Sequence, residues 1–325
     1  MKLRQKGTGL VLGAIVIAEP SNGDDWLGSL SNVPVLGNSV LSRTLDRIKR
    51  SGVAEICVLN NRLEAERATH AVSSPVGVQD PWCEAAQQLL AFEAKGLEYA
   101  LILRVGPYVE CDLAVLAGWH RGRGEMISRV YDNQGALDFW ILDLNRFRER
   151  EDLLGALYAA AAAEFETPGY VNRLTGPEEY RSLVTDILTS RCQTRPYGTE
   201  VRKGMWIAEG AQIARGARVV APAYVGRGVR IAEECLLTRA TSVEQNSYID
   251  FGTAVEDSSI MPNTYVGIGL DVSHSVVDGG ELLNLNHGVK LKITDPVVMR
   301  RNTPRSHRTF SSEPELGAVT LSGAG

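Results

Sequence analysis

The sequence is poor in aromatic residues and has no closely spaced pair of cysteines. Aromatic residues make up 6% of its 325 residues, and no Cys-x-x-Cys pair occurs. The five cysteines are scattered along the chain, at Cys57, Cys83, Cys111, Cys192 and Cys235. This pattern predicts neither a metal site nor a disulfide framework. We therefore expect reduced thiols and a cytoplasmic location.

An excess of positive charge is also missing. The 34 lysines and arginines are outnumbered by 39 aspartates and glutamates, and the net charge is −5. Proteins that bind nucleic acid usually present a basic face. The basic run Arg300–Arg308 lies in a segment with Ser, Gly and Pro and without apolar periodicity. We predict no nucleic-acid partner and a flexible tail over residues 294–325.

Long hydrophobic runs are absent as well. The apolar run Gly9–Ala18 has ten residues and follows Lys2, Arg4 and Lys6. Ten residues are too few to span a bilayer as a helix, so we predict no membrane partner. The run is compatible with a weak signal peptide or with a buried first strand. We favour the strand.

Glycine, in contrast, is abundant. The chain has 32 glycines, against an average share of about 7% in globular proteins. Hydrophobic residues make up 44%, which is enough for a substantial core. Glycine without matching proline predicts many tight turns.

A six-residue repeat occupies the C-terminal half. Nine consecutive positions at this spacing are aliphatic: Ile207, Ile213, Val219, Val225, Ile231, Leu237, Val243, Ile249 and Val255. The phase then slips, and the pattern continues to Leu283 and Val289. Three short strands joined by tight corners would form one coil, and stacked coils would bury these side chains. The pattern resembles that of left-handed parallel β-helices, and we predict such a domain, of roughly five coils, over residues 205–293.

Two histidines in this repeat suggest a catalytic role. Acyltransferases with hexapeptide repeats use a histidine at a coil edge as general base. His274 and His287 are the candidates here. A histidine at a coil corner can instead be merely exposed or bonded to a neighbouring carbonyl group, so both interpretations stay open.

The N-terminal half alternates strand-like and helix-like segments. Strands are predicted at Gly13–Ala18, Glu55–Leu59, Tyr99–Val105 and Leu137–Leu142, and helices at Ser39–Ser51, Trp82–Lys95, Leu113–Arg121 and Asp152–Glu164. This alternation predicts an α/β domain with a mostly parallel sheet covered on both faces. We expect it over residues 1–190, followed by a linker over residues 191–204.

Several segments of this half resemble one protein family. They occur in the order Ala14–Ala18, Pro34–Leu41, Ser51–Val58, Leu101–His120 and Gly169–Tyr180. Together they resemble the nucleoside-diphosphate-sugar pyrophosphorylases, which are sugar-1-phosphate nucleotidyltransferases. In several branches of that family a left-handed β-helix follows. The resemblance implies a Rossmann-like nucleotidyltransferase domain and supports a first strand at residues 9–18.

The same resemblance implies a magnesium-dependent reaction of a nucleoside triphosphate with a sugar 1-phosphate. The family's glycine-rich phosphate loop is replaced here by a segment with Pro20, Asp24 and Asp25. Proline has no N–H to offer a phosphate, and the two carboxylates would repel one. The family's base-contact segment aligns with Pro81–Ala85, without its glycines.

Two aspartates of the family's motifs are also replaced. The aspartate that holds magnesium aligns with Pro107, and the aspartate of the last motif aligns with Arg173. Gly106, Asp112 and Arg173 would form what remains of the pocket. Asp112 keeps a carboxylate near the sheet edge, although a helix N-cap explains it more simply.

We therefore predict a catalytically silent homologue of nucleotide-sugar metabolism, without a cofactor, which regulates or scaffolds and could bind a nucleotide sugar. One alternative is an active nucleotidyltransferase with magnesium bound by Asp24, Asp25 or Asp112. Another is an acyltransferase that uses His274 or His287. From the β-helix we expect a homo-oligomer, or a hetero-oligomer with an active paralogue.

Overall fold

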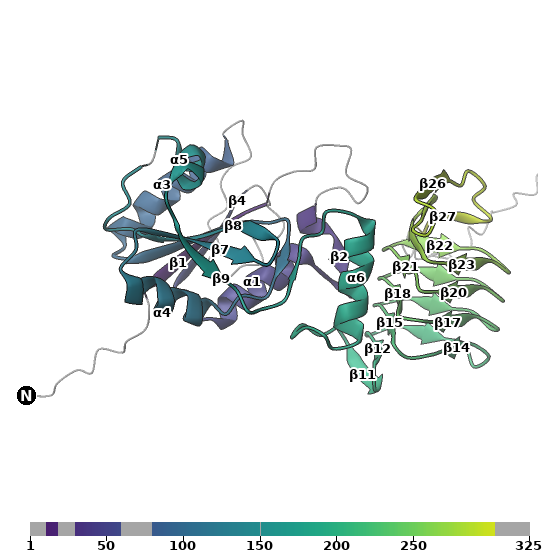
Figure 1. Ribbon diagram of the computed structural model, residues 1–325. Coiled ribbons are helices and arrows are strands. Elements are labelled where there is room, and N and C mark those ends of the chain that lie inside the picture. The colour runs from purple at the N-terminus through teal and green to yellow at the C-terminus, as the bar shows by residue number, and fades with distance from the viewer. Residues whose placement is uncertain (1–10, 19–29, 60–79, 150, 303–325) are drawn as a thin grey trace, which may run out of the picture.

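The computed structural model describes residues 11–18, 30–59, 80–149 and 151–302. These residues form a mixed α/β region followed by a strand-rich region, with helix α6 (Pro177–Leu188) lying between the two (Figure 1). The predicted mixed α/β class with mostly parallel strands is confirmed at this level. In the described part of the chain, no helix is long and apolar enough to cross a membrane. Asp24 and Asp25 lie outside the described residues.

A six-stranded sheet forms the centre of the α/β region. Its strands lie in the order β4 (Glu55–Leu59), β1 (Leu12–Ile17), β5 (Tyr99–Arg104), β8 (Gly135–Asp143), β7 (Ile127–Asp132) and β9 (Ala163–Glu166). β1 pairs in parallel with both β4 and β5, and all six of its residues are buried. Alternate side chains of β1 enter two different core clusters, one on each face of the sheet. The apolar run at residues 12–17 is therefore a strand covered on both faces.

Helices cover the two faces of this sheet. α3 (Pro81–Ala94) and α5 (Leu153–Ala159) contribute to one core cluster. α1 (Val40–Arg50), α4 (Leu113–Arg123) and α6 contribute to the other. In Figure 1, α3 and α5 lie on the opposite side of the sheet from α4.

The helix predicted at Asp152–Glu164 is wrong in its second half. Helix α5 ends at Ala159, and Ala163–Glu166 forms strand β9. β9 pairs in parallel with β7, an element that the sequence did not predict. Tertiary strand pairing overrides the helix propensity of this alanine-rich segment.

Short strands and one helical turn complete the α/β region. A 3-10 helix η1 (Leu30–Asn32) precedes the hairpin of β2 (Pro34–Val35) and β3 (Asn38–Ser39). The turn residues Leu36 and Gly37 both have positive φ, which matches the twist of a two-residue hairpin loop. β6 (Tyr108–Val109) pairs antiparallel with β10 (Val171–Asn172).

In the strand-rich region, successive strands belong in turn to three sheets, within which the strands named next pair in parallel. The first contains β12 (Met205–Ile207), β15 (Ala223–Val225), β18 (Thr241–Val243), β21 (Ser259–Ile260) and β24 (Ser275–Asp278). The second contains β13 (Gln212–Ile213), β16 (Arg230–Ile231), β19 (Tyr248–Ile249) and β22 (Thr264–Val266). The third contains β14 (Arg218–Val219), β17 (Leu236–Thr238), β20 (Ala254–Glu256) and β23 (Asp271–Ser273).

The six-residue aliphatic pattern forms the core of this region. Ile207 pairs with Val225, and Val225 pairs with Val243, so equivalent positions of successive layers lie next to each other. From Val225 to Val277 the repeat positions belong to one buried cluster. The first three, Ile207, Ile213 and Val219, are half-buried at the open end of the stack.

The last part of the predicted repeat is wrong. β25 (Glu281–Asn284) and β26 (Val289–Lys292) pair antiparallel and add to the edge of the first sheet. Leu283 and Val289 therefore do not continue the parallel layers, and Val289 is exposed.

The strands at either end of this region also correct the sequence prediction. β27 (Met299–Arg301) pairs antiparallel with β22, so the segment predicted as a flexible tail has a strand near its start. β11 (Thr199–Arg202), within the predicted linker, pairs with β12.

Candidate functional site

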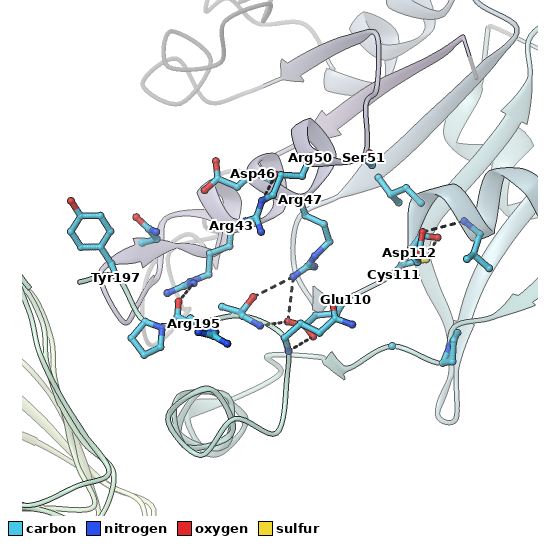
Figure 2. A pocket seen from close by; sticks show the side chains of 18 of the residues that line it. Arg43, Asp46, Arg47, Arg50, Ser51, Glu110, Cys111, Asp112, Arg195 and Tyr197 are labelled. Atoms are coloured by element: carbon cyan, nitrogen blue, oxygen red, sulfur yellow. Dashed lines mark hydrogen bonds and ion pairs between the residues drawn. The ribbon is translucent and has the colours of Figure 1, made fainter. Parts of the chain in front are cut away.

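A cleft of about 970 Å³ lies between helix α1, the loop that leads into α4, and residues 193–198. Residues 193–198 connect α6 to β11, so the cleft lies where the chain leaves the α/β region. Figure 2 shows α1 along one side, with Glu110 and Asp112 across from it. Its charged lining consists of four arginines and three carboxylates: Arg43, Arg47, Arg50, Arg195, Asp46, Glu110 and Asp112.

Glu110 is the buried acidic group of the cleft. Its carboxylate accepts hydrogen bonds from the Tyr108 hydroxyl at 2.9 Å and from the backbone N–H groups of Gln193 at 2.8 Å and Thr194 at 3.0 Å. Arg47 forms an ion pair with it at 3.4 Å. These partners compensate the desolvation of a buried carboxylate. Glu110 therefore fastens the connecting segment to the α/β region.

Two arginines of α1 also serve the structure. Arg43 is 7% exposed and donates to the carbonyl groups of Val35, Leu36 and Arg195. Burial lowers the pKa of its guanidinium. Arg47 donates to the carbonyl of Val109 and lies over the Tyr108 ring, 5.2 Å from its centroid. Because most N–H donors of these two guanidinium groups already bind protein oxygens, few of them are available to a ligand.

The other two arginines have spare donors. Arg50 is exposed, and its Nε donates to the carbonyl of Asp46 at 3.1 Å within the same helix. Arg195 is exposed too, and within the described part of the chain its guanidinium has no hydrogen-bond partner. The two side chains come from different elements on the rim of one cleft (Figure 2).

The structure places one of the predicted pocket residues in this cleft. Asp112 lines it, and its Oδ1 accepts from the backbone N–H groups of Ala114 at 2.9 Å and Val115 at 3.2 Å. This is the N-cap of α4. Gly106 and Arg173 do not line the cleft, so the structure does not bring the three residues together there.

Arg173 forms an ion pair elsewhere. Its Nη2 donates to Asp132 at 2.5 Å and to the carbonyl of Gly135 at 3.0 Å. Partial burial alone would raise the pKa of Asp132, but the bonds from Arg173 and from the amides of Gln134 and Gly135 together lower it. In the antiparallel register, Asn172 pairs with Tyr108. Arg173 directly follows Asn172, and Pro107 directly precedes Tyr108. The two positions that differ from the motifs of the family that the sequence resembles therefore flank the same pair of strand residues.

The two histidines lie apart from the cleft and from each other. His274 is at a corner of the coil stack, and its Nδ1 is 2.7 Å from Oδ2 of Asp257. Arg181 of α6 binds the other oxygen of Asp257 at 2.8 Å. His287 is exposed between β25 and β26, where its backbone N–H donates to Asn284. The carboxylate could orient the His274 imidazole, whereas His287 has no comparable side-chain partner within the described residues.

Sequence reasoning missed a buried carboxylate at the junction of the two regions. Glu244, after β18, is fully buried and accepts from the N–H groups of Leu36 at 2.7 Å and Gly37 at 3.0 Å. Burial raises its pKa to about 7, although these two N–H groups and Arg43 act in the opposite direction. A charged residue directly after the repeat position Val243 was the available signal. Glu110, Arg43 and Arg47 carried no pattern of their own.

Among the described residues, no group of three or more His, Cys, Asp or Glu side chains could hold a metal ion. Neither a model of a known protein family nor a curated protein matches the chain.

Proposed function

We propose that the chain is a nucleotidyltransferase-like protein of nucleotide-sugar metabolism that has lost catalysis and acts as a regulatory or scaffolding subunit. The observation that carries this proposal is that Pro107 and Arg173 flank the same strand pair, Tyr108 of β6 and Asn172 of β10. The family resemblance puts an aspartate at each of these two positions. Here one has no ligand atom in its side chain, and the other is a cation.

The fold supports this family at a finer level than the α/β class. We propose a Rossmann-like N-terminal domain, because β1 lies between two parallel neighbours and is covered on both faces. We propose a left-handed β-helix for the coils. Their corners contain residues with positive φ, among them Asn246, Asn263 and Asp257, which allow tight turns between short strands. The left hand is what the resemblance of the six-residue repeat implies.

The chemistry of the family does not fit these residues. Attack of a sugar phosphate on the α-phosphorus requires compensation of negative charge, which a carboxylate-bound magnesium ion supplies. Magnesium prefers oxygen ligands, and Pro107 and Arg173 offer none. The guanidinium of Arg173 is also engaged with Asp132, whose carboxylate is thereby removed as a ligand.

The active alternative would need other carboxylates. Asp112 would have to leave the two backbone N–H groups that it caps. Asp24 and Asp25 lie outside the described residues. The acyltransferase alternative would use His274 with Asp257 as its orienting carboxylate, but that carboxylate is shared with Arg181. The proposal of a catalytically silent homologue is therefore favoured over both alternatives.

The decisive experiment measures release of pyrophosphate. Purified protein is incubated with each nucleoside triphosphate and a panel of sugar 1-phosphates in the presence of magnesium, alongside an active pyrophosphorylase as positive control. We expect no turnover above background. Metal-dependent turnover that Asp112→Asn abolishes would replace the proposal by the active alternative.

Two binding measurements complete the comparison. A nucleotide-sugar screen by thermal shift, with and without magnesium, tests whether a ligand is retained without catalysis. An acyl-CoA arm with His274→Gln as its control tests the acyltransferase alternative. Saturable acyl-CoA binding that His274→Gln weakens would favour that alternative over the proposal.

We further propose that the protein works as an oligomer, either with itself or with an active paralogue. The proposal rests on the coil stack, because β-helix domains of the kind that it resembles commonly assemble side by side. Light scattering of the purified protein tests self-association. Co-purification with an active pyrophosphorylase from the same source tests the mixed assembly. A monomer that binds no such enzyme would contradict both forms.

A further inference from the structure

We propose that the cleft between α1 and residues 193–198 binds a small molecule with two linked phosphate groups, through Arg50 and Arg195. This site is separate from the position of Pro107 and Arg173, which do not line the cleft. The binding site stands on the cleft's own geometry. A regulatory meaning for it rests on the proposed function.

The charge balance of the cleft favours an anion. Glu110 is satisfied by Tyr108, Arg47 and two backbone N–H groups, and Asp112 by the start of α4. The third carboxylate, Asp46, is exposed to solvent. The guanidinium groups of Arg50 and Arg195 are then the groups with uncommitted donors. Their positive charge is not cancelled by a buried partner.

The chemistry of these donors points to phosphate. A guanidinium group offers paired N–H donors in the geometry that matches two oxygens of one phosphate. Two such groups, one on α1 and one on the connecting segment, suit a ligand with two phosphates. A volume of about 970 Å³ is large enough for a nucleoside diphosphate, because small-molecule pockets are roughly 300–1,000 Å³. Tyr197, 39% exposed at one end of the cleft, could contact the remainder of such a ligand.

Binding at this place would have a structural consequence. Arg50 belongs to α1, which lies within the α/β region. Arg195 belongs to the segment that leads to β11, and its carbonyl already accepts from Arg43. A diphosphate that contacts both side chains would add a second connection between α1 and this segment. Occupancy of the cleft would thus stabilise the junction of the two regions.

The test is calorimetric titration of the full chain with inorganic pyrophosphate and with guanosine and adenosine diphosphate, in the absence of magnesium. We expect saturable binding that weakens as ionic strength rises. Loss of a charge-assisted contact costs about tenfold in affinity, so Arg50→Gln and Arg195→Gln should each weaken binding by about that factor. Arg230→Gln, an exposed arginine of the coil stack, is the matched control and should bind like the unaltered chain. Both cleft arginines are exposed, so these variants should keep the thermal stability of the ligand-free protein.

Two results would overturn the site. One is no binding of pyrophosphate or of either diphosphate at low ionic strength and millimolar concentration. The other is unchanged affinity in the Arg50→Gln, Arg195→Gln double variant; if Arg173→Gln weakens binding instead, the ligand lies at the family's reaction centre. Turnover by the unaltered chain would sink the proposed function and leave this site intact, so the two failures are distinguishable.

Discussion

Glu244 provides the sharpest test of how the two regions are joined. Its buried carboxylate accepts two backbone N–H groups from the turn between β2 and β3, 2.7 and 3.0 Å away. Burial raises its pKa from 4.5 to about 7. The change Glu244→Gln keeps the shape of the side chain and removes its titration. The matched control is Glu209→Gln, because Glu209 is an exposed glutamate of the same coil stack.

The sign of the effect follows from linkage. A carboxyl group whose pKa is higher in the folded state favours folding in its protonated form. Its contribution is fully present below pH 4.5 and is lost as the pH rises through about 7. A rise from 4.5 to about 7 corresponds to about 3 kcal/mol of unfolding free energy. The contribution of Glu244 is therefore about 3 kcal/mol smaller at pH 8 than at pH 4.5.

The measurement is urea unfolding of the chain and both variants across this pH range. Other groups titrate as well, so the informative quantity is the difference between each variant and the unaltered chain. We expect Glu244→Gln to lack about 3 kcal/mol of the decrease in stability between acidic and mildly basic pH, and Glu209→Gln to retain it. Parallel pH profiles for the chain and Glu244→Gln would refute the reasoning, because burial would then not disfavour the charged form.

Three further changes test the packing of the described structure. Arg181→Met removes a buried guanidinium that binds Asp257, Ser259 and a backbone carbonyl, and should lower the unfolding free energy by about 3 kcal/mol in urea; stability equal to that of the unaltered chain would contradict a role in joining α6 to the coils. Ile249→Ala empties a fully buried repeat position and should cost about 3 kcal/mol in the same assay, and a cost well below 1 kcal/mol would argue against a packed coil interior. A Cβ at residue 169 would lie 1.6 Å from the carbonyl oxygen of Glu110, whereas nothing lies within 4 Å of one at residue 106. Gly169→Ala should therefore lower the melting temperature and Gly106→Ala should not, and equal melting temperatures would contradict this geometry.

The elements that the sequence predicted well share one property, which is a burial pattern written into neighbouring residues. The strand predicted at residues 55–59 is β4, and the predicted helix at residues 39–51 is α1 with its flanking cap residues. In α1, the apolar residues Val40, Leu41, Leu45 and Ile48 are all buried, as their spacing indicated. Local periodicity is sufficient where one face is apolar and the rest is polar.

The elements that it missed depend on distant partners. β7 has a mixed sequence, and it is a strand because it pairs with β8 and β9. β9 follows an alanine-rich helix, and no local signal ends that helix at Ala159. The antiparallel strands β25 and β26 replace the parallel layers at residues where the six-residue pattern of the sequence still continues.

The candidate site was the least predictable part of the molecule. Asp112 lies in a segment that resembles a family motif, and the structure shows it at the N-cap of α4. Glu110 has no local sequence signal, because its backbone partners Gln193 and Thr194 are more than eighty positions away. Arg50 and Arg195 looked like any exposed arginines until the fold brought them to one cleft.

The sequence by itself determined the repeat and its core, because a side chain at every sixth position faces inward whenever short strands turn at regular corners. It also determined the buried strand β1, whose residues are apolar without interruption. Only the tertiary structure decided which charged residues are buried. Glu244 and Leu36 are separated by 208 positions, and the carboxylate is tolerated without solvent because that distant turn supplies its hydrogen-bond donors. The residues next to a charged side chain in the sequence do not indicate such a distant partner. The junction and the cleft could therefore be recognised only in the folded chain.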